Sequence, residues 1–171
     1  MQAKSIQQEQ SQNDPLFVTA EDFNVDNVFV TKPKLKEVKS GKTMLLSFFG
    51  YNYDNGKSAA LYIMTPLRFS TQWDVSDYEG DGKYFLTLSK HQSVINDADI
   101  RFFNKLKQLD KKLIKHGIKY SNEIFSKDYE EDKHSEIVEA MYHNCVSIKH
   151  NKVTKQPYPP QIKVKFPIDN D

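Results

Sequence analysis

The chain has 171 residues, of which 38% are hydrophobic, and a formal net charge of +1 at pH 7. This length supports one domain with a hydrophobic core. The single cysteine, Cys145, excludes an internal disulfide and predicts a reducing, intracellular location. No apolar run approaches membrane-spanning length and no hydrophobic signal segment begins the chain, so we expect a soluble protein without membrane contact.

The N-terminal region divides into a tail and a strand. Residues 1–15 are rich in Gln, Ser and Asn and hold almost no apolar side chain, which predicts a disordered tail. Residues 16–171 are expected to form a single domain. Within it, residues 23–30 alternate sufficiently to predict a first strand. The basic segment that starts at Pro33 predicts a connection or an edge strand, because proline cannot donate to a central ladder.

The clearest local signal is Asn55-Gly56, which separates strand-like runs at residues 44–54 and 57–64. This dipeptide favours a hairpin with a two-residue type I′ turn, which would pair Asp54 with Lys57. Alternation then predicts two faces, only one of which needs to be core. The aromatic face comprises Phe49, Tyr51, Tyr53 and Tyr62. The opposite face comprises Leu46, Phe48, Leu61 and Ile63.

After the hairpin, residues 83–89 predict a further strand and residues 97–119 predict a long helix. Apolar side chains recur at helical spacing along one side of that helix, whereas the other side is strongly basic and expected to be mainly solvated. Asp97 and Asp99 suit its N-cap and first turn. The remaining predicted elements are a helical turn at 121–125, a helix at 134–145 and strands at 146–149 and 161–166.

Strands, a long helix and then further strands is the order of an OB-type barrel. We therefore predict an α+β fold, an OB-like β-barrel with the long helix inserted between the early and late strands. A generic α+β sandwich is the alternative. The chain ends at Asp171 soon after the last predicted strand, so we expect the domain to be truncated at its C-terminal end.

The aromatic face of the hairpin lies where such barrels present a binding surface. Exposed aromatic rings hold single-stranded nucleic acids by stacking on their bases, and lysines contact the phosphates. The predicted nucleic-acid-binding residues are Tyr51, Tyr53, Lys57, Tyr62, Trp73, Lys149, Lys152, Lys155 and Tyr158. In this prediction Trp73 acts as a loop clamp. The alternative is that the aromatic face packs on another element or binds a protein.

No catalytic site, metal site or cofactor is predicted. The acidic run between Asp74 and Asp81 contains Gly80 and favours a solvated turn. The spacing of His143, Cys145 and His150 matches no common zinc arrangement. The sequence also lacks the glycine-rich phosphate loops and the nucleophile motifs of common enzyme classes. These patterns favour a binding protein without enzymatic activity.

A resemblance to a known family is carried by five segments between Met44 and Phe166, namely LLSFFGYNYDNG, ALYIMTP, KYFLTLS, FFNKLKQLDKKLIKHGIKYSNEIF and QPYPPQIKVKFP. They resemble the single-stranded-DNA-binding protein family of the nucleocytoplasmic large DNA viruses, of asfarvirus type, which has an OB-fold core. Family members extend past the point where this chain ends.

The resemblance implies sequence-nonspecific binding of single-stranded DNA during viral DNA replication, repair or recombination. RNA is a further candidate ligand, and replication proteins are candidate partners. The implied location is the viral factory in the host cytoplasm, or the virion. A protein-interaction or virion-structural domain that uses the aromatic hairpin face is the alternative function.

Overall fold

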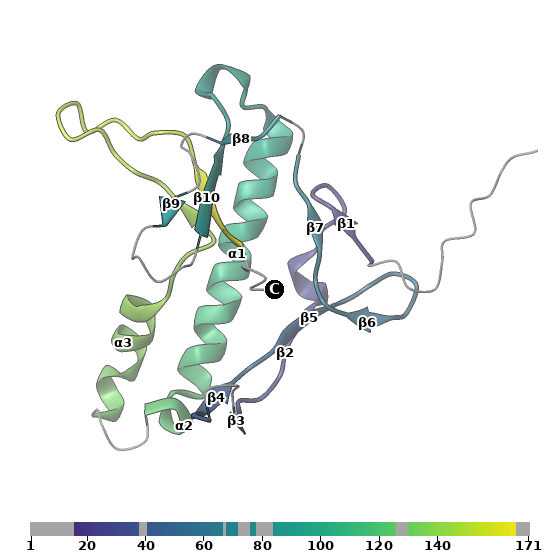
Figure 1. Cartoon of the computed structure of the whole chain (residues 1–171), viewed down its shortest axis with the longest axis vertical. Coiled ribbons are helices and arrows are strands. Elements are labelled where there is room, and N and C mark those ends of the chain that lie inside the picture. Colours follow the sequence, from purple (N-terminus) through teal and green to yellow (C-terminus); the bar gives the residue numbers. More distant parts are fainter. Residues whose placement is uncertain are drawn as a thin grey trace, which may run out of the picture.

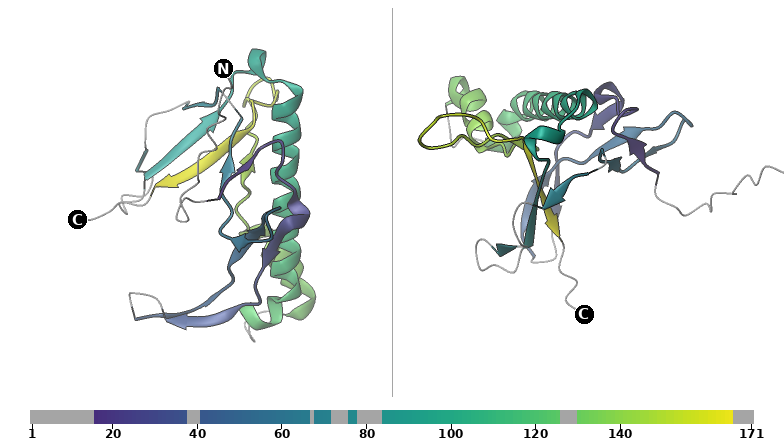
Figure 2. Two further views of the ribbon diagram at one scale, coloured as in Figure 1. Left: turned by 90° about the vertical axis from the view of Figure 1, so that its right-hand side faces the viewer. Right: turned by 90° about the horizontal axis from the view of Figure 1, so that it is seen from above.

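The computed structural model describes residues 16–37, 41–66, 68–71, 76–77, 84–125 and 130–166. Its longest element is the helix α1 (Asp97–Lys119), and the other elements lie along it (Figure 1). The early strands flank one side of α1, and the helix α3 (His134–Met141) flanks the other, as the view from above also shows (Figure 2). The fold is therefore mixed α+β, as the sequence predicts.

The early strands form three small sheets. The first pairs β1 (Val18–Thr19) with β7 (Ile63–Met64) in parallel. The second has the order β2 (Val28–Val30), β5 (Phe49–Asn52) and β6 (Ser58–Ala59). The third pairs β3 (Lys34–Glu37) with β4 (Thr43–Leu46) and is called the arm below.

The late strands form one larger antiparallel sheet. Its path runs β11 (Val146–Ser147), β12 (Gln161–Phe166), β10 (Tyr84–Ser89) and β8 (Ser70–Thr71), and β9 (Ser76–Asp77) also pairs with β10. The remaining helices are α2 (Ser121–Phe125) and the short 3₁₀ turns Val25–Asn27, Gln92–Val94 and Glu131–Lys133. In the chain, helix α1 thus follows the strands β1 to β10 and precedes β11 and β12, as expected.

No closed barrel forms among the described residues, where the strands make four separate sheets. The predicted OB-like barrel is therefore not confirmed. Two of the expected long strands are interrupted. Ser47 and Phe48 separate β4 from β5, and residues 60–62 separate β6 from β7. Each fragment pairs with a different partner, so no continuous strand is available to close the sheet.

The start of α1 is fixed by a capping box. The Asn96 side chain accepts a hydrogen bond from the Asp99 N–H, and the Asp99 carboxylate accepts one from the Asn96 N–H, both at 3.0 Å. The N-cap is therefore Asn96 and not Asp97, because Asp99 occupies the third helical position that reciprocal capping requires. Asp99 is fully buried and also pairs with Lys90, whose Nζ lies 2.5 Å from its Oδ1.

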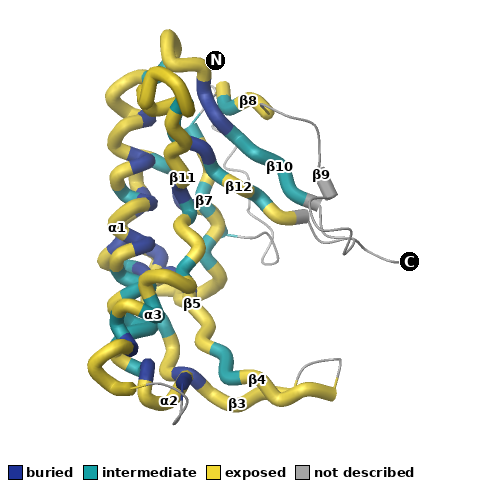
Figure 3. The backbone as a smooth tube through the Cα atoms, turned by 90° about the vertical axis from the view of Figure 1, so that its left-hand side faces the viewer, coloured by how far each residue is buried: buried dark blue, intermediate teal, exposed yellow. Residues whose placement is uncertain are grey.

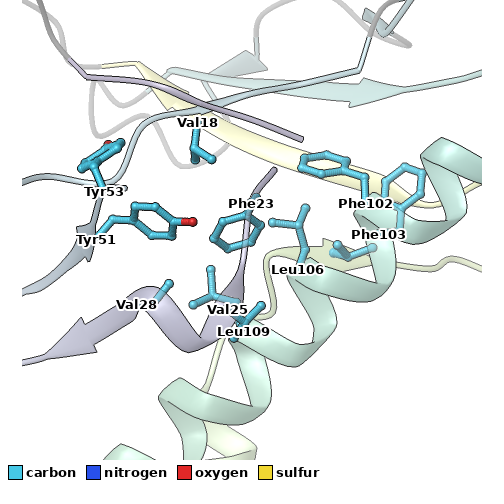
Figure 4. Close-up of a cluster of buried hydrophobic side chains, with 11 residues drawn as sticks. Val18, Phe23, Val25, Val28, Tyr51, Tyr53, Phe102, Phe103, Leu106 and Leu109 are labelled. Carbon is cyan, nitrogen blue, oxygen red and sulfur yellow. The ribbon is translucent and has the colours of Figure 1, made fainter. Parts of the chain in front are cut away.

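The apolar side of α1 builds the core together with the early strands (Figure 4). The helix contributes Phe102, Phe103, Leu106 and Leu109. Phe23, Val25, Val28, Tyr51 and Tyr53 face it from the N-terminal half. The aromatic members contact one another, with ring centroids 5.9 Å apart for Phe23 and Tyr51 and 4.9 Å apart for Tyr51 and Tyr53.

The basic side of α1 is only partly solvated. Lys105 donates to the carbonyl oxygens of Ala20 and Glu21. Lys112 donates to the carbonyl oxygen of Val25 at 2.9 Å and to that of Asp26 at 3.3 Å. These two lysines lie seven residues apart, on one side of the helix, and fasten the segment before β2 to it.

The turn at Asn55-Gly56 differs from the expected type I′ form. The Gly56 N–H donates to Tyr53 O at 2.9 Å, and the Tyr53 N–H donates to Lys57 O at 2.8 Å. Gly56 has φ +77°, whereas Asn55 is not among the residues with positive φ. This is a three-residue loop with glycine in the left-handed position. The strands consequently pair Tyr51 with Ala59, one residue away from the predicted register.

Candidate nucleic-acid interface

Tyr51 and Tyr53, which the sequence places on an exposed binding face, are core residues. Their side chains are 2% and 8% exposed. The Tyr51 hydroxyl accepts from the Asn24 N–H at 3.1 Å. The Tyr53 hydroxyl lies 2.8 Å from Ala60 O and accepts from the Tyr62 N–H at 3.2 Å. The prediction of an exposed face is wrong for both residues, because internal partners satisfy their hydroxyl groups and allow burial.

The opposite expectation, that Phe48 is core, is also wrong. Phe48 is 55% exposed and Phe49 is 50% exposed. Phe48 belongs to the break between β4 and β5, where its N–H donates to Thr31 Oγ1 at 2.9 Å. The alternation of inward and outward side chains along a strand therefore does not continue through Phe48. The Nζ of Lys36 lies 5.2 Å from the centroid of the Phe48 ring.

Lys57 and Tyr62 are exposed, but they lie far from the other predicted lysines. Both belong to the early-strand side of α1, whereas the hairpin that precedes β12 projects from the other side (Figures 1 and 2). The structure does not bring the predicted binding residues into one surface. Trp73 lies outside the described residues, as does most of the acidic run that follows it.

The predicted residues near the C-terminus do come together, in an ordered hairpin that we call the basic hairpin (Lys149–Tyr158). A bridge joins His150 to Pro157. The Tyr158 N–H donates to Lys149 O, and the Asn151 N–H donates to Gln156 O, both at 2.8 Å. Asn151 Oδ1 accepts from two N–H groups at the tip, and Asn151 Nδ2 donates to the Tyr158 hydroxyl at 3.1 Å.

This hairpin presents its charged side chains to solvent. Lys149, Lys152 and Lys155 are exposed, and Tyr158 is 47% exposed. Lys155 takes φ +59°, which closes the tip. Few apolar side chains are available for burial, and Val153 at the tip is 88% exposed. The backbone bonds described above, and not a hydrophobic core, therefore hold this hairpin in shape.

The basic hairpin leads directly into β12, which extends the same chemistry. Lys163 is paired with Thr87 and Lys165 with Phe85, so these side chains share one face of the β10–β12 ladder. The Nζ atoms of both lysines lie over the Phe85 ring, at 3.9 Å from its centroid for Lys163 and 6.0 Å for Lys165. These three residues are not among those predicted from the sequence. The alternation of lysine in residues 161–166 was the available signal.

We call the basic hairpin together with Phe85, Lys163 and Lys165 the basic surface. From Lys149 to Lys165 the sequence contains five lysines and no acid. All five lysine side chains are exposed. Exposed lysines on the hairpin and on β12, together with two partly accessible aromatic rings, form an arrangement that can contact phosphates and bases.

The base of this surface is anchored to α1 through Asp110, which is buried. Asp110 Oδ1 accepts from the Tyr142 hydroxyl and from the Cys145 N–H, both at 2.9 Å. Burial, reinforced by Asp110, raises the pKa of the Cys145 thiol to about 12. Burial also raises the pKa of Tyr142, again with help from Asp110. Both groups are therefore neutral at physiological pH, and the thiol is a poor nucleophile.

The described residues contain neither a metal-binding cluster nor a membrane-spanning helix. No group of three or more His, Cys, Asp and Glu side chains is close enough to hold a metal ion. Within the same part of the chain, no helix has the length and apolar character needed to cross a membrane. Comparison with protein-family models, with curated proteins and with solved structures finds no match to this chain.

Proposed function

We propose that the protein binds single-stranded DNA without sequence preference, through the basic surface. The observation that carries this proposal is the row of five exposed lysines without an acid between Lys149 and Lys165, on an ordered hairpin and strand. The family resemblance of the sequence adds the context of viral DNA replication, repair or recombination. The residues first assigned to stacking, Tyr51 and Tyr53, are not part of this site.

Electrostatics and aromatic chemistry support the proposal in different ways. Lysines that neutralise phosphates release counterions, which gives affinity independent of sequence. Half-exposed rings such as Tyr158 can stack on unpaired bases, and a base inside a duplex does not offer its face in this way. Phe85 holds the ammonium groups of Lys163 and Lys165 over its ring, where they are available to phosphates beside a stacked base.

An OB-type core also belongs to this proposal. The place of α1 between β10 and β11 in the chain supports it, whereas the sheets among the described residues do not close into a barrel. A protein-interaction function is the second candidate. It is favoured by the exposed rings of Phe48 and Phe49, which lie away from the basic surface.

The test is a fluorescence-anisotropy titration with labelled oligonucleotides at several salt concentrations. Replacing Lys149, Lys152 and Lys155 together by alanine should weaken binding to all single-stranded sequences alike. It should also reduce the slope of log K against log salt by up to about 0.7 for each lost phosphate contact. Duplex DNA and RNA of the same sequence serve as competitors and report ligand preference.

The matched control removes the same charge elsewhere. Lys107, Lys111 and Lys115 are exposed on α1, outside the basic surface. Their triple alanine variant should keep nearly the wild-type affinity and salt slope. An equal loss of affinity in both triple variants would show that only the net charge of the protein matters. The basic surface would then not be the binding site. Binding of duplex DNA in preference to single strands would overturn the single-strand assignment.

A further inference from the structure

The arm stands away from the body of the protein and has few neighbours (Figures 2 and 3). All of β3 is exposed, and in β4 only Leu45 and Leu46 are partly covered. Leu35 is 74% exposed and Met44 is 50% exposed. Leu35 pairs with Leu45, and Met44 pairs with Lys36, so the two exposed apolar side chains lie on opposite faces of the ribbon.

A ribbon of this kind is not expected to be stable alone. An isolated two-stranded hairpin is marginal in water and gains stability from further strands or from packing on a helix. The described residues supply neither along the outer part of the arm. Exposed leucine and methionine on both faces therefore indicate that the arm is completed by a partner.

The two edges of the arm differ in charge. Three of the four residues of β3 are charged, namely Lys34, Lys36 and Glu37. None of the four residues of β4 is charged. Lysines on an edge strand oppose pairing with another strand, and β4 lacks this protection. In the part of the chain that is described, β4 pairs only with β3, so its other edge is open to a further strand.

We infer that β4 pairs with β4 of a second copy of this chain, antiparallel across a two-fold axis. The result is a four-stranded sheet with the order β3, β4, β4 of the second copy and β3 of the second copy. A two-fold axis perpendicular to the sheet places Leu45 opposite its own equivalent and Met44 opposite Leu46 of the second copy. Only uncharged side chains meet at the new pairing.

Charge explains why the pairing uses β4 and why a second copy suits it. The same symmetry applied to β3 would set Lys36 opposite Lys36, or Lys34 opposite Lys36, and like charges directly opposite are unfavourable. With β4 at the centre, these lysines lie on the outer strands, away from the axis. The closed pairing also removes the open β4 edge from both copies at once. This inference concerns the arm and does not rest on the basic surface.

Sedimentation velocity of the full chain over a wide dilution series tests it. The wild-type chain should sediment as a dimer that dissociates on dilution. Leu45→Lys and Leu45→Glu should each sediment as monomers, because like charges then meet at the axis. An equimolar mixture of the two variants should recover the dimer, because lysine then faces glutamate. Val153→Lys, the same change at the tip of the basic hairpin, should remain dimeric.

A second measurement covers the case in which the charged variants do not fold. Leu45→Cys in a Cys145→Ser chain should form a covalent dimer on mild oxidation, and Val153→Cys in the same background should not. A monomeric wild-type chain at every concentration would overturn the inference. So would a mixture of folded Lys and Glu variants that stays monomeric. A monomeric chain in which Leu45→Glu weakens oligonucleotide binding would instead assign the arm to nucleic acid.

Discussion

The hairpin between β5 and β6 and the basic hairpin are built by opposite means. The first buries Tyr51 and Tyr53 in the hydrophobic core and satisfies their hydroxyl groups inside the protein. The second buries almost nothing and is held by its own backbone and by Asn151. Both contain tyrosine and lysine. The partners available inside the fold, and not the residue type, therefore decide which side chains stay exposed to a ligand.

The largest effect should separate the tyrosines of the two hairpins. Tyr51→Ala should lower the free energy of unfolding by about 3–5 kcal/mol, as emptying a buried aromatic site does. Tyr158→Ala should change it by no more than about 0.5 kcal/mol, the range of exposed positions. Chemical denaturation of both variants measures the contrast. Equal losses of unfolding free energy in the two variants would contradict the view that one tyrosine is core and the other is exposed.

Tyr158→Ala has a second expected effect, on binding. Loss of one stacked base should weaken single-strand affinity by about 1–3 kcal/mol. Tyr158→Phe keeps the ring and is the control, so it should bind nearly as well as the wild type. Anisotropy titrations decide the matter. A phenylalanine variant as weak as the alanine variant would attribute the effect to the hydroxyl and its bond with Asn151 Nδ2.

A pair of lysines on α1 sharpens the same lesson. Lys112 donates to two carbonyl oxygens of the segment before β2, whereas the neighbouring Lys111 is exposed. Lys112→Ala should cost about 1–2 kcal/mol of stability, because hydrogen bonds to a charged donor are lost. Lys111→Ala should cost less than about 0.5 kcal/mol. Thermal or denaturant melts of the two variants measure these stabilities. Equal losses of stability would contradict the prediction.

Asn151→Ala probes what holds the basic hairpin. Its side chain accepts two tip N–H groups, so the change should cost about 0.5–1.5 kcal/mol, confined to the hairpin. Amide hydrogen exchange should therefore speed up in residues 149–158 and remain unchanged in α1. Faster exchange throughout the chain would mean that the hairpin is coupled to the core after all.

A further effect concerns pH and the base of the basic hairpin, and it is absent below pH 9. The pKa of Cys145 is raised from 9.0 to about 12 in the folded protein, so the unfolded chain releases this proton first. The contribution of Cys145 to stability is accordingly constant below pH 9 and falls between pH 9 and 12. Alkylation of the native thiol at pH 8 should be slow, and denaturant should accelerate it. Equal rates would show an accessible thiolate.

The helix positions follow from the sequence to a large extent. The bounds of α1 and α2, and those of β12, agree with the predicted ranges, because helical periodicity and alternation are properties of neighbouring residues. The sequence does not predict which side chains near Asn55-Gly56 face the core. Whether Phe48 or Tyr51 points inward depends on which strand each fragment pairs with, and those partners lie far along the chain.

The candidate site shows the same limit. Charge composition identifies the basic hairpin, because lysines without neighbouring acids are not buried in a protein core and the segment must therefore lie at the surface. It does not identify Phe85, whose contact with Lys163 and Lys165 depends on the register of β10 with β12. Nor does it exclude Tyr51 and Tyr53, since hydroxyl partners such as Asn24 are visible only in the folded chain.

Helix α1 also acts as a spacer. With 23 residues at about 1.5 Å each, it is about 35 Å long. The arm lies near its C-terminal end, and the sheet that carries β10 lies toward its N-terminal end (Figure 1). A dimer joined through its arms therefore carries its two basic surfaces at remote ends, clear of the dimer contact. Under the proposed function, that geometry suits a dimer that holds two separate DNA strands more than one that covers a single DNA strand.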